Sequence, residues 1–187
     1  MKKGLKFVVL VLGIFALFIN LQFVSADANY ALTGTPSHAN QQAGANNYLI
    51  WTWQDAKLKD DLTSDIAHGV VVSNQARYST WASFDSIINF PSPVAQLDKI
   101  EVVFGLYGGN QVAQFKAYVN TGAGWQQVGD TGSFAMPRTG TLSFTTGAPW
   151  NNVQGIKIYS YSLTTGQSYV DYRIFEIRGY WAWGLRP

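Results

Sequence analysis

The 187-residue chain contains no cysteine, which excludes disulfide bonds and thiolate metal sites. Charged residues make up only 13% of the chain, whereas surface helices usually need Glu, Lys and Arg on their solvent-exposed side. Only two histidines occur: His38 lies in a polar segment, and His68 starts a strand-like run of valines. Two histidines are too few for a histidine-rich metal site, and their positions do not suit a catalytic triad.

Common catalytic motifs are also missing, since the chain has no G-x-S-x-G, H-E-x-x-H or phosphate-loop pattern. Its only glutamates, Glu101 and Glu176, lie in strand-like stretches, and small jelly-roll glycosidases use two strand glutamates as nucleophile and acid/base. The motifs that surround those glutamates are absent here, and the alternation places Glu101 on the solvent side. We therefore predict a protein that is not an enzyme, with a glycosidase as an alternative.

The first 26 residues are organised as an export signal. Lysines at positions 2, 3 and 6 precede an apolar stretch over residues 7–18, and Val24-Ser25-Ala26 forms a small-residue cleavage site. An uncleaved anchor is the alternative, because residues 7–24 approach the length that spans a bilayer. We expect cleavage, which would give a secreted or cell-surface chain with no membrane span.

Removing the signal changes the charge balance. The whole chain has 13 basic and 11 acidic residues, so cleavage would leave 10 basic residues and a formal charge of −1. Nucleic-acid binding depends on neutralising many phosphates with basic side chains. A near-neutral chain therefore argues against a nucleic-acid partner.

The remaining chain reads as a short leader and one domain. Residues 27–47 are small and polar and show no periodicity, so we expect a flexible leader. Residues 48–187 contain about eight short stretches of alternating apolar residues, separated by turns rich in glycine, proline and asparagine. No amphipathic helix of about ten residues lies between them. This pattern predicts an all-β domain, an antiparallel β-sandwich or jelly roll.

The most regular alternation covers residues 100–106 and 115–119, with a glycine- and asparagine-containing break at residues 108–110. It predicts two half-buried strands joined as a β-hairpin. Before this hairpin, we expect Pro91 and Pro93 to end a strand over residues 80–90, because proline lacks a backbone donor.

Near the C-terminus, apolar residues occupy even-numbered positions up to Ile174 and odd-numbered positions from Phe175. Side chains alternate along a strand, so such a change puts successive apolar residues on opposite faces. One extra residue would restore the pattern, and we therefore predict a β-bulge at this position.

Four stretches resemble the discoidin-type galactose-binding domain, also called the coagulation-factor C-type domain. They read LDKIEVVFG, FKAYVNTGAGWQQVG, NVQGIKIYSYS and VDYRIFEIRGY, and the matching positions are Phe115, Gly124, Trp125, Val128, Ile156, Ile158, Ile174, Glu176 and Gly179. The cysteine pair of many animal members is absent. The resemblance implies a jelly roll that binds glycans, or in some members lipid head groups, through loops at one end, often with a structural calcium ion.

The order of the strands assigns each loop to one of the two ends of the predicted sandwich. In an up-and-down antiparallel order, the turns near residues 74–78, 107–111, 130–139 and 163–167 share one end, and the resemblance implies that recognition loops lie there. Aromatic rings stack on the apolar face of a pyranose, and amide and guanidinium groups bind its hydroxyls. The predicted ligand-binding residues are therefore Arg77, Tyr78, Tyr107, Asn110, Phe134 and Arg138.

An alternative for this group is that Tyr78 and Phe134 are edges of the core and the arginines are solvated. At the opposite end, a predicted turn carries a second candidate ligand patch, formed by Trp150, Asn151 and Asn152. The most charged loop offers a possible calcium site, because calcium prefers oxygen ligands. Its carboxylates are Asp60, Asp61 and Asp65, although two lysines dilute their charge.

Together these patterns predict an exported, non-catalytic protein that binds carbohydrate at a cell or polysaccharide surface. The alternative is a structural surface protein, a coat or filament subunit that self-associates. That hypothesis is favoured by the low charge and by the aromatic C-terminal residues Tyr180, Trp181 and Trp183.

Overall fold

A computed structural model describes residues 28–44, 48–60, 65–73, 80–107, 111–135, 138–164 and 169–181. Within it, Asn29–Trp181 form one compact unit. The expected export signal lies outside the described residues, as do Asp61, Arg77, Tyr78 and Asn110, and only the backbone of Arg138 is described. No helix in the described part is long and apolar enough to cross a bilayer.

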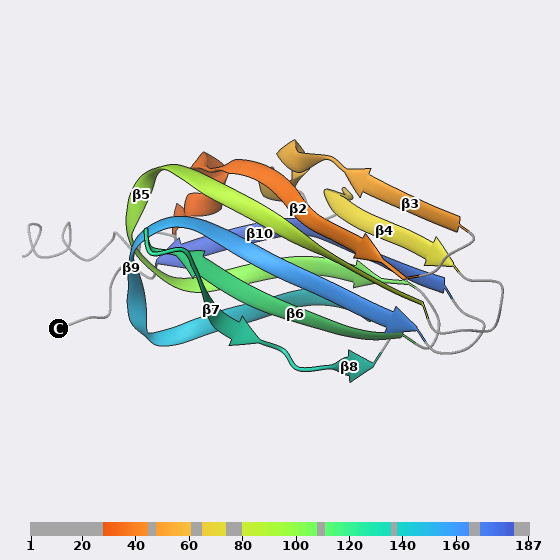
Figure 1. The fold of residues 1–187 in the computed structure, drawn as a ribbon. Helices are drawn as coiled ribbons and strands as arrows, with labels where there is room; N and C mark the ends of the chain where they lie inside the picture. Colours follow the sequence, from red (N-terminus) through yellow and green to blue (C-terminus); the bar gives the residue numbers. More distant parts are fainter. Residues whose placement is uncertain are drawn as a thin grey trace, which may run out of the picture. The chain divides into compact units, whose positions relative to one another are not determined.

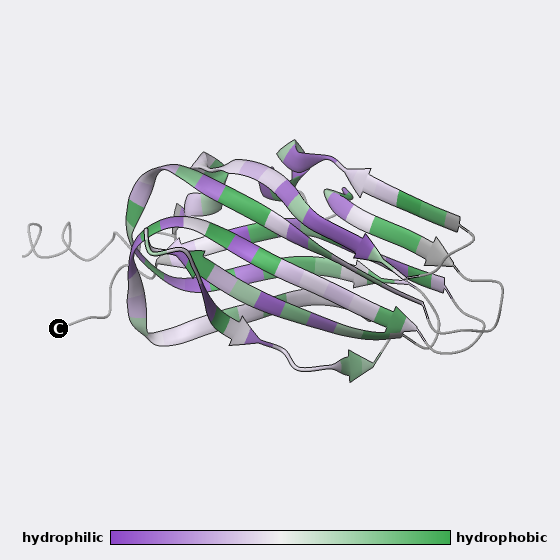
Figure 2. Cartoon of the chain, viewed as in Figure 1, coloured by the Kyte–Doolittle hydropathy of each residue, from purple (hydrophilic) through white to green (hydrophobic). Residues whose placement is uncertain are grey.

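Ten strands and two short 3₁₀ turns make up the described chain, which confirms the all-β class expected from the sequence. The elements are β1 (Ala28–Asn29), η1 (Tyr30–Thr33), β2 (Thr35–Ala43), β3 (Tyr48–Trp53), η2 (Asp55–Lys59), β4 (His68–Ser73), β5 (Thr80–Leu106), β6 (Gln111–Asn120), β7 (Trp125–Asp130), β8 (Phe134–Ala135), β9 (Arg138–Thr164) and β10 (Tyr169–Trp181). Hydrophobic and polar residues alternate along the long strands (Figure 2), as expected for strands with one buried face.

Two long strands, β5 and β9, run through both layers of the sandwich (Figure 1). Residues 80–89 of β5 pair with residues 155–164 of β9, and residues 99–106 pair with residues 138–145. The first layer consists of these initial β5 and final β9 residues together with β2, β6, β7 and β8. The second layer consists of the other halves of β5 and β9 with β10, β4 and β3. The predicted antiparallel β-sandwich is confirmed.

The prolines bend β5 and do not end it. The register of β5 on β9 shifts between Asn89 and Val94, the stretch that contains Pro91 and Pro93. Proline is tolerated at such irregularities because no ladder hydrogen bond is required there, and strands that change sheets do so at bends. The expectation that these prolines terminate a strand is therefore wrong.

Most of the expected flexible leader is an edge strand. β2 pairs antiparallel with β5, from Thr35 opposite Asn89 to Ala43 opposite Ala82. An edge strand has only one partner, and the β2 side chains are exposed or half-buried, so no apolar period marks it in the sequence. The prediction of a leader without regular structure is wrong for residues 35–43.

The two most regular strands form as predicted, but they do not pair with each other. β6 pairs with β9, β7 and β8 in the first layer, whereas residues 99–106 of β5 pair with β9 and β10 in the second. The alternation of residues indicates which face of a strand is buried and carries no information about its neighbour. The predicted hairpin is therefore wrong.

The predicted bulge is confirmed, because the register of β10 on β5 shifts between Ile174 and Glu176. The extra residue allows Ile174 and Ile177 to join the core between the layers. Phe175 instead lines a hollow with Val103. The bulge thus supplies an aromatic ring to the surface described next.

Candidate functional site

The strand ends that flank the predicted recognition loops lie together at one end of the sandwich (Figure 1). In the first layer, Thr164 is opposite both Thr80 and Gln111. In the second layer, Leu106 is opposite both Arg138 and Tyr172. The grouping of these loops by strand order is therefore confirmed for the flanking strands, while the roles of the residues in the loops stay predictions.

Phe134 lies at the edge of the core, as the alternative interpretation held. Its ring centroid is 6.1 Å from that of Phe104 and 6.0 Å from that of Phe115, and it packs against the core cluster. A ring in that position contributes to packing between β8 and the layers. Tyr107 is different, because 44% of it is exposed.

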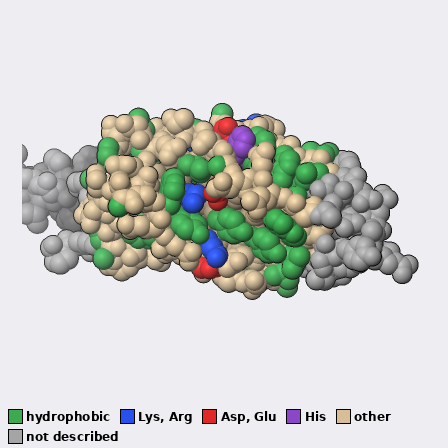
Figure 3. Space-filling view, in the orientation of Figure 1, with side chains coloured by type: hydrophobic (Ala, Val, Ile, Leu, Met, Phe, Trp, Pro, Cys, Tyr) green, Lys and Arg blue, Asp and Glu red, His purple; other side chains and the backbone are tan. Residues whose placement is uncertain are grey.

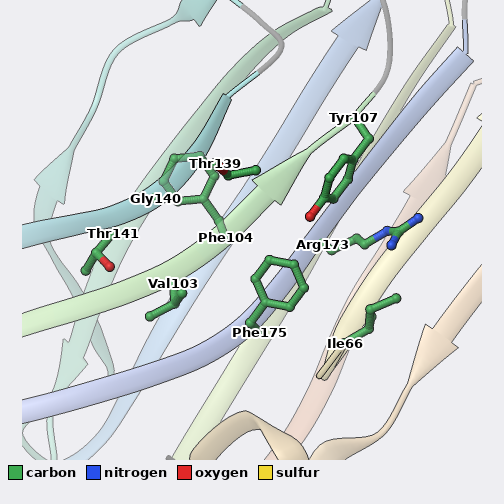
Figure 4. A pocket seen from close by; sticks show the side chains of 9 residues that line it. All are labelled: Ile66, Val103, Phe104, Tyr107, Thr139, Gly140, Thr141, Arg173 and Phe175. Carbon is green, nitrogen blue, oxygen red and sulfur yellow. The ribbon is translucent and has the colours of Figure 1, made fainter. Parts of the chain in front are cut away.

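Tyr107 stands over a hollow of about 470 Å³ on the second layer, close to these strand ends (Figure 4). The hydroxyl of Tyr107 points toward the space above Phe175, and the threonines lie on the other side. The residues that line the hollow are Ile66, Val103, Phe104, Tyr107, Thr139, Gly140, Thr141, Arg173 and Phe175. Tyr107 directly follows β5, Ile66 precedes β4, and the other lining residues come from β5, β9 and β10.

Arg173 has a fixed position in this hollow. Its guanidinium carbon lies 4.6 Å from the centroid of the Tyr107 ring, a cation–π contact. Its Nε and Nη2 groups each donate a hydrogen bond of 2.9 Å to the carboxylate of Asp171. These hydrogen bonds raise the pKa of the Arg173 guanidinium, which stays charged. A bidentate pair holds the plane of a guanidinium more tightly than a single contact does.

Gly105 makes room for the Tyr107 ring. It lies opposite Arg173 on β10 and Thr139 on β9. A Cβ atom at this position would lie 2.7 Å from the Cε2 and hydroxyl atoms of Tyr107 and 2.9 Å from the Phe175 ring. Only glycine therefore allows these two rings to approach each other across the strand.

The hollow combines an apolar floor with polar groups at its rim. The Phe175 and Tyr107 rings provide apolar surface, whereas Thr139, Thr141 and Arg173 provide hydroxyl and guanidinium groups. Of the five N–H donors of a guanidinium, Asp171 accepts from two. This arrangement suits a small ligand that has both an apolar face and several hydroxyls.

Of the predicted ligand-binding residues, Tyr107 lines this hollow, whereas Arg173, Asp171 and Phe175 were not predicted from the sequence. All three lie within β10, where the alternation gave no reason to separate them from other strand residues. The one available signal was the change in apolar alternation at Phe175. It indicated an irregular stretch of strand, but not which residues lie beside that stretch.

The first layer carries a second, smaller hollow of about 330 Å³ on its outer face, lined by Gln114, Lys116, Tyr118, Tyr159 and Tyr161. Figure 3 shows the face of the first layer, with hydrophobic side chains beside basic and acidic ones. Lys157 lies over the rings of Tyr118 and Trp125, at 4.4 and 5.3 Å from their centroids. Tyr118 in this hollow and Tyr107 in the other thus each have a cation over one ring face.

The second candidate patch lies in the bend of β9. Trp150 is opposite Leu97 and packs partly against the core. The side chain of Asn151 accepts a hydrogen bond of 3.3 Å from Gln96, and Asn152 has a positive φ of 56°. Part of this patch therefore serves the bend itself, and its ligand role stays a prediction.

The described carboxylates of the predicted calcium and glycosidase sites are engaged in ion pairs or close contacts. Asp65 pairs with Lys57 at 2.8 Å, and Asp60 is exposed. Glu176 is completely buried and accepts a hydrogen bond of 2.8 Å from Arg178. Glu101 lies 3.4 Å from Lys99. A buried glutamate paired with arginine does not present the accessible carboxyl that glycoside hydrolysis requires.

The two histidines come together, contrary to what their positions in the sequence suggested. Nδ1 of His38 lies 2.9 Å and Nε2 of His68 lies 2.8 Å from the same Asp55 oxygen, Oδ1. β2, expected to be a flexible leader, places His38 beside the start of β4. The sequence analysis did not predict that the two histidines share a partner.

Comparison with known proteins found similarity among solved structures alone, since no family model and no curated protein matches the chain. The family 32 carbohydrate-binding module of NanJ from Clostridium perfringens, solved with galactose, has a TM-score of 0.48 and 13% identity, and the match covers 83% of this chain and all of that one. Chitosan-binding module 1 of a chitosanase/glucanase from Paenibacillus sp. IK-5 has a TM-score of 0.47 and 13% identity, with 82% and 99% covered.

A third structure, CBM32-1 of a family 31 glycoside hydrolase from Clostridium perfringens, has a TM-score of 0.43 and 17% identity, with 76% of this chain and 94% of that chain covered. All three of these solved structures are carbohydrate-binding modules. At these identities the likeness concerns the arrangement of strands.

Proposed function

We propose that this protein is an exported, non-catalytic carbohydrate-binding module and that the hollow lined by Tyr107 and Arg173 receives a sugar ring. The observation that carries the proposal is the placement of an exposed tyrosine ring beside a guanidinium that Asp171 holds in place. Such a site orients a ligand without needing a nucleophile or a general acid.

The chemistry of the hollow favours a neutral sugar. The apolar face of a pyranose packs on the rings of Tyr107 and Phe175, while its hydroxyls accept from Arg173 and exchange hydrogen bonds with Thr139 and Thr141. Because Asp171 neutralises Arg173, an anionic group gains little extra attraction there. The volume of about 470 Å³ lies within the range of small-molecule sites, about 300–1,000 Å³.

Export follows from the signal-like residues 1–26. Outside the cell, the module would hold its chain on a polysaccharide or on the glycoconjugates of a cell surface. N-terminal sequencing of chain recovered from culture medium tests this part: a first residue of Asp27 supports it, and retention of Met1 in the membrane fraction contradicts it.

Carbohydrate binding is tested by screening the chain on an array of neutral glycans and titrating the strongest ligand by calorimetry. Arg173→Gln and Tyr107→Ala each remove one half of the site, and each should weaken binding about tenfold or more. Tyr107 is exposed, whereas Arg173 is half-buried and pairs with the buried Asp171, so urea unfolding of each variant is measured to confirm that it is folded.

Tyr161→Ala in the hollow of the first layer provides the control, since it removes a half-buried tyrosine from a different hollow and should leave the affinity unchanged. Two results would contradict the proposal: no glycan binds saturably, or the Tyr161 variant loses binding while the Arg173 and Tyr107 variants keep it. Concentration-dependent polymers without glycan binding would favour the structural surface protein.

A further inference from the structure

Three ligand-type side chains meet where the two layers come together at one edge. His38 comes from β2, Asp55 begins η2, and His68 begins β4. One potential ligand atom from each residue lies within 4.8 Å of the others. β2 belongs to the first layer and β4 to the second, so the three residues connect segments that share no strand pairing.

We infer that His38, Asp55 and His68 form a binding site for a divalent transition-metal ion, with zinc as the ion that best fits the donor set. Two imidazole nitrogens and one carboxylate oxygen are a common set of protein ligands for zinc, and water completes the tetrahedron. Calcium is disfavoured because it prefers oxygen ligands. The site lies apart from the sugar hollow and does not depend on the proposed function.

The buried side of the cluster already has the outer contact that a metal-bound histidine needs. His68 is completely buried, and its Nδ1 atom lies 2.7 Å from the hydroxyl oxygen of Ser86, which is also buried. Histidine ligands are usually oriented by a hydrogen bond from the ring nitrogen that does not bind the metal. A serine hydroxyl donates or accepts, so it matches His68 both without metal and with metal on Nε2.

Burial lowers the pKa of His68 to about 4, although Asp55 favours its charged form. Burial raises the pKa of Asp55, but hydrogen bonds from the two histidines outweigh this and lower it overall. Both shifts follow from the burial of His68 and from the short contacts of the two histidines with Asp55.

His38 is held in its orientation by aromatic stacking. Its ring lies parallel to that of Trp53, at 4.1 Å between centroids and an interplanar angle of 2°. Trp53 in turn stacks on Trp51 at 5.4 Å. The stack leaves Nδ1 of His38 facing Asp55, so the imidazole needs little reorientation to bind an ion.

The other side of the cluster is open to solvent. The side chains of His38 and Asp55 are 29% and 38% exposed, which gives an ion a path to the site and leaves room for a water ligand. Tetrahedral zinc with bonds of about 2.0–2.1 Å keeps its ligands roughly 3.3 Å apart. The present separations of 2.8 and 2.9 Å therefore need to open by about half an ångström, through the two exposed side chains.

A metal ion bound here would cross-link the two layers in a chain that has no disulfides. Binding to the folded state alone raises the unfolding temperature, and a 100-fold excess over Kd predicts a rise of roughly 5–10 °C for a domain of this size. Stabilisation by zinc is thus the expected result of site formation.

The test uses the full chain without an affinity tag, treated with chelator and then titrated with Zn²⁺ by calorimetry. Wild type should bind one equivalent and unfold at a higher temperature. His38→Gln keeps a planar group over Trp53 and Asp55→Asn keeps a hydrogen-bonding side chain, yet both should lose the stoichiometric binding and the thermal shift. Unfolding of each variant in chelator confirms that it is folded.

Asp130→Asn is the matched control, because it removes a half-exposed carboxylate from β7, far along the chain from the cluster. It should bind zinc like wild type. Co²⁺ in place of zinc should give the intense visible spectrum of a four-coordinate ion. Three results would overturn the inference. The His38 and Asp55 variants bind zinc as wild type does, zinc does not bind wild type stoichiometrically, or Co²⁺ keeps the pale spectrum of its hydrated form.

Discussion

The ring of Phe84 in the first layer stacks on the ring of Tyr172 in the second, with centroids 4.9 Å apart and an angle of 4° between the planes. Both side chains are completely buried. The hydroxyl of Tyr172 donates a hydrogen bond of 3.0 Å to the backbone oxygen of Ser160 on β9. This one pair therefore joins three strands through packing and a satisfied buried hydroxyl.

Loss of stability at high pH should depend on Tyr172. Burial raises the pKa of its hydroxyl well above the usual value of 10, so the unfolded chain ionises first. The stabilisation is complete below pH 10 and is lost as pH rises above it, by up to about 1.4 kcal/mol per pH unit. Urea unfolding between pH 8 and 11.5 should show a shallower decline for Tyr172→Phe than for wild type. Equal slopes would contradict this assignment.

Gly105→Ala should weaken glycan binding without unfolding the chain. The new methyl group would meet the Tyr107 ring at 2.7 Å, and because Tyr107 is exposed its ring can move away. Displacing that ring removes one wall of the sugar hollow, and we expect a loss of affinity of about tenfold. Calorimetry with the array-selected glycan measures it. Unchanged affinity would place the ligand elsewhere.

Gly155→Ala should lower the free energy of unfolding by about 1–3 kcal/mol. A Cβ atom there would lie 2.9 Å from the backbone oxygen of Ile88 and 3.2 Å from the Trp125 ring. The backbone oxygen cannot move without disturbing the pairing of β5 with β9. Gly147→Ala is the control, because nothing lies within 4 Å of its added atom. Chemical denaturation of the two variants should differ, and equal midpoints would refute the contact.

Part of the fold could be predicted from the pattern of neighbouring residues alone. The change of parity at Phe175 is a property of a few adjacent residues, and the bulge formed where it was predicted. The position of Tyr107 at the end of a strand could be predicted because strand ends and the grouping of loops follow from the order of strands along the chain. These features depend on side-chain alternation and on little else.

Features that depend on distant partners could not be predicted. One partner of β6 is β9, more than 30 residues further along the chain, and alternation is the same for any partner. His38 lies in an edge strand whose polar sequence has no period, so its approach to His68 had no local signal. Arg173 is one of several outward residues on β10, and only the glycine opposite it at position 105 opens the space beside it.

The central claim is that a sugar ring occupies the hollow lined by Tyr107 and Arg173. Its most direct test is a ¹⁵N-amide NMR titration of the chain with the strongest glycan from the array. The account predicts saturable shifts concentrated at Gly105, Tyr107, Thr139 and Arg173. Shifts concentrated instead at Trp150 and Asn151, or at the tyrosines of the first layer, would contradict it.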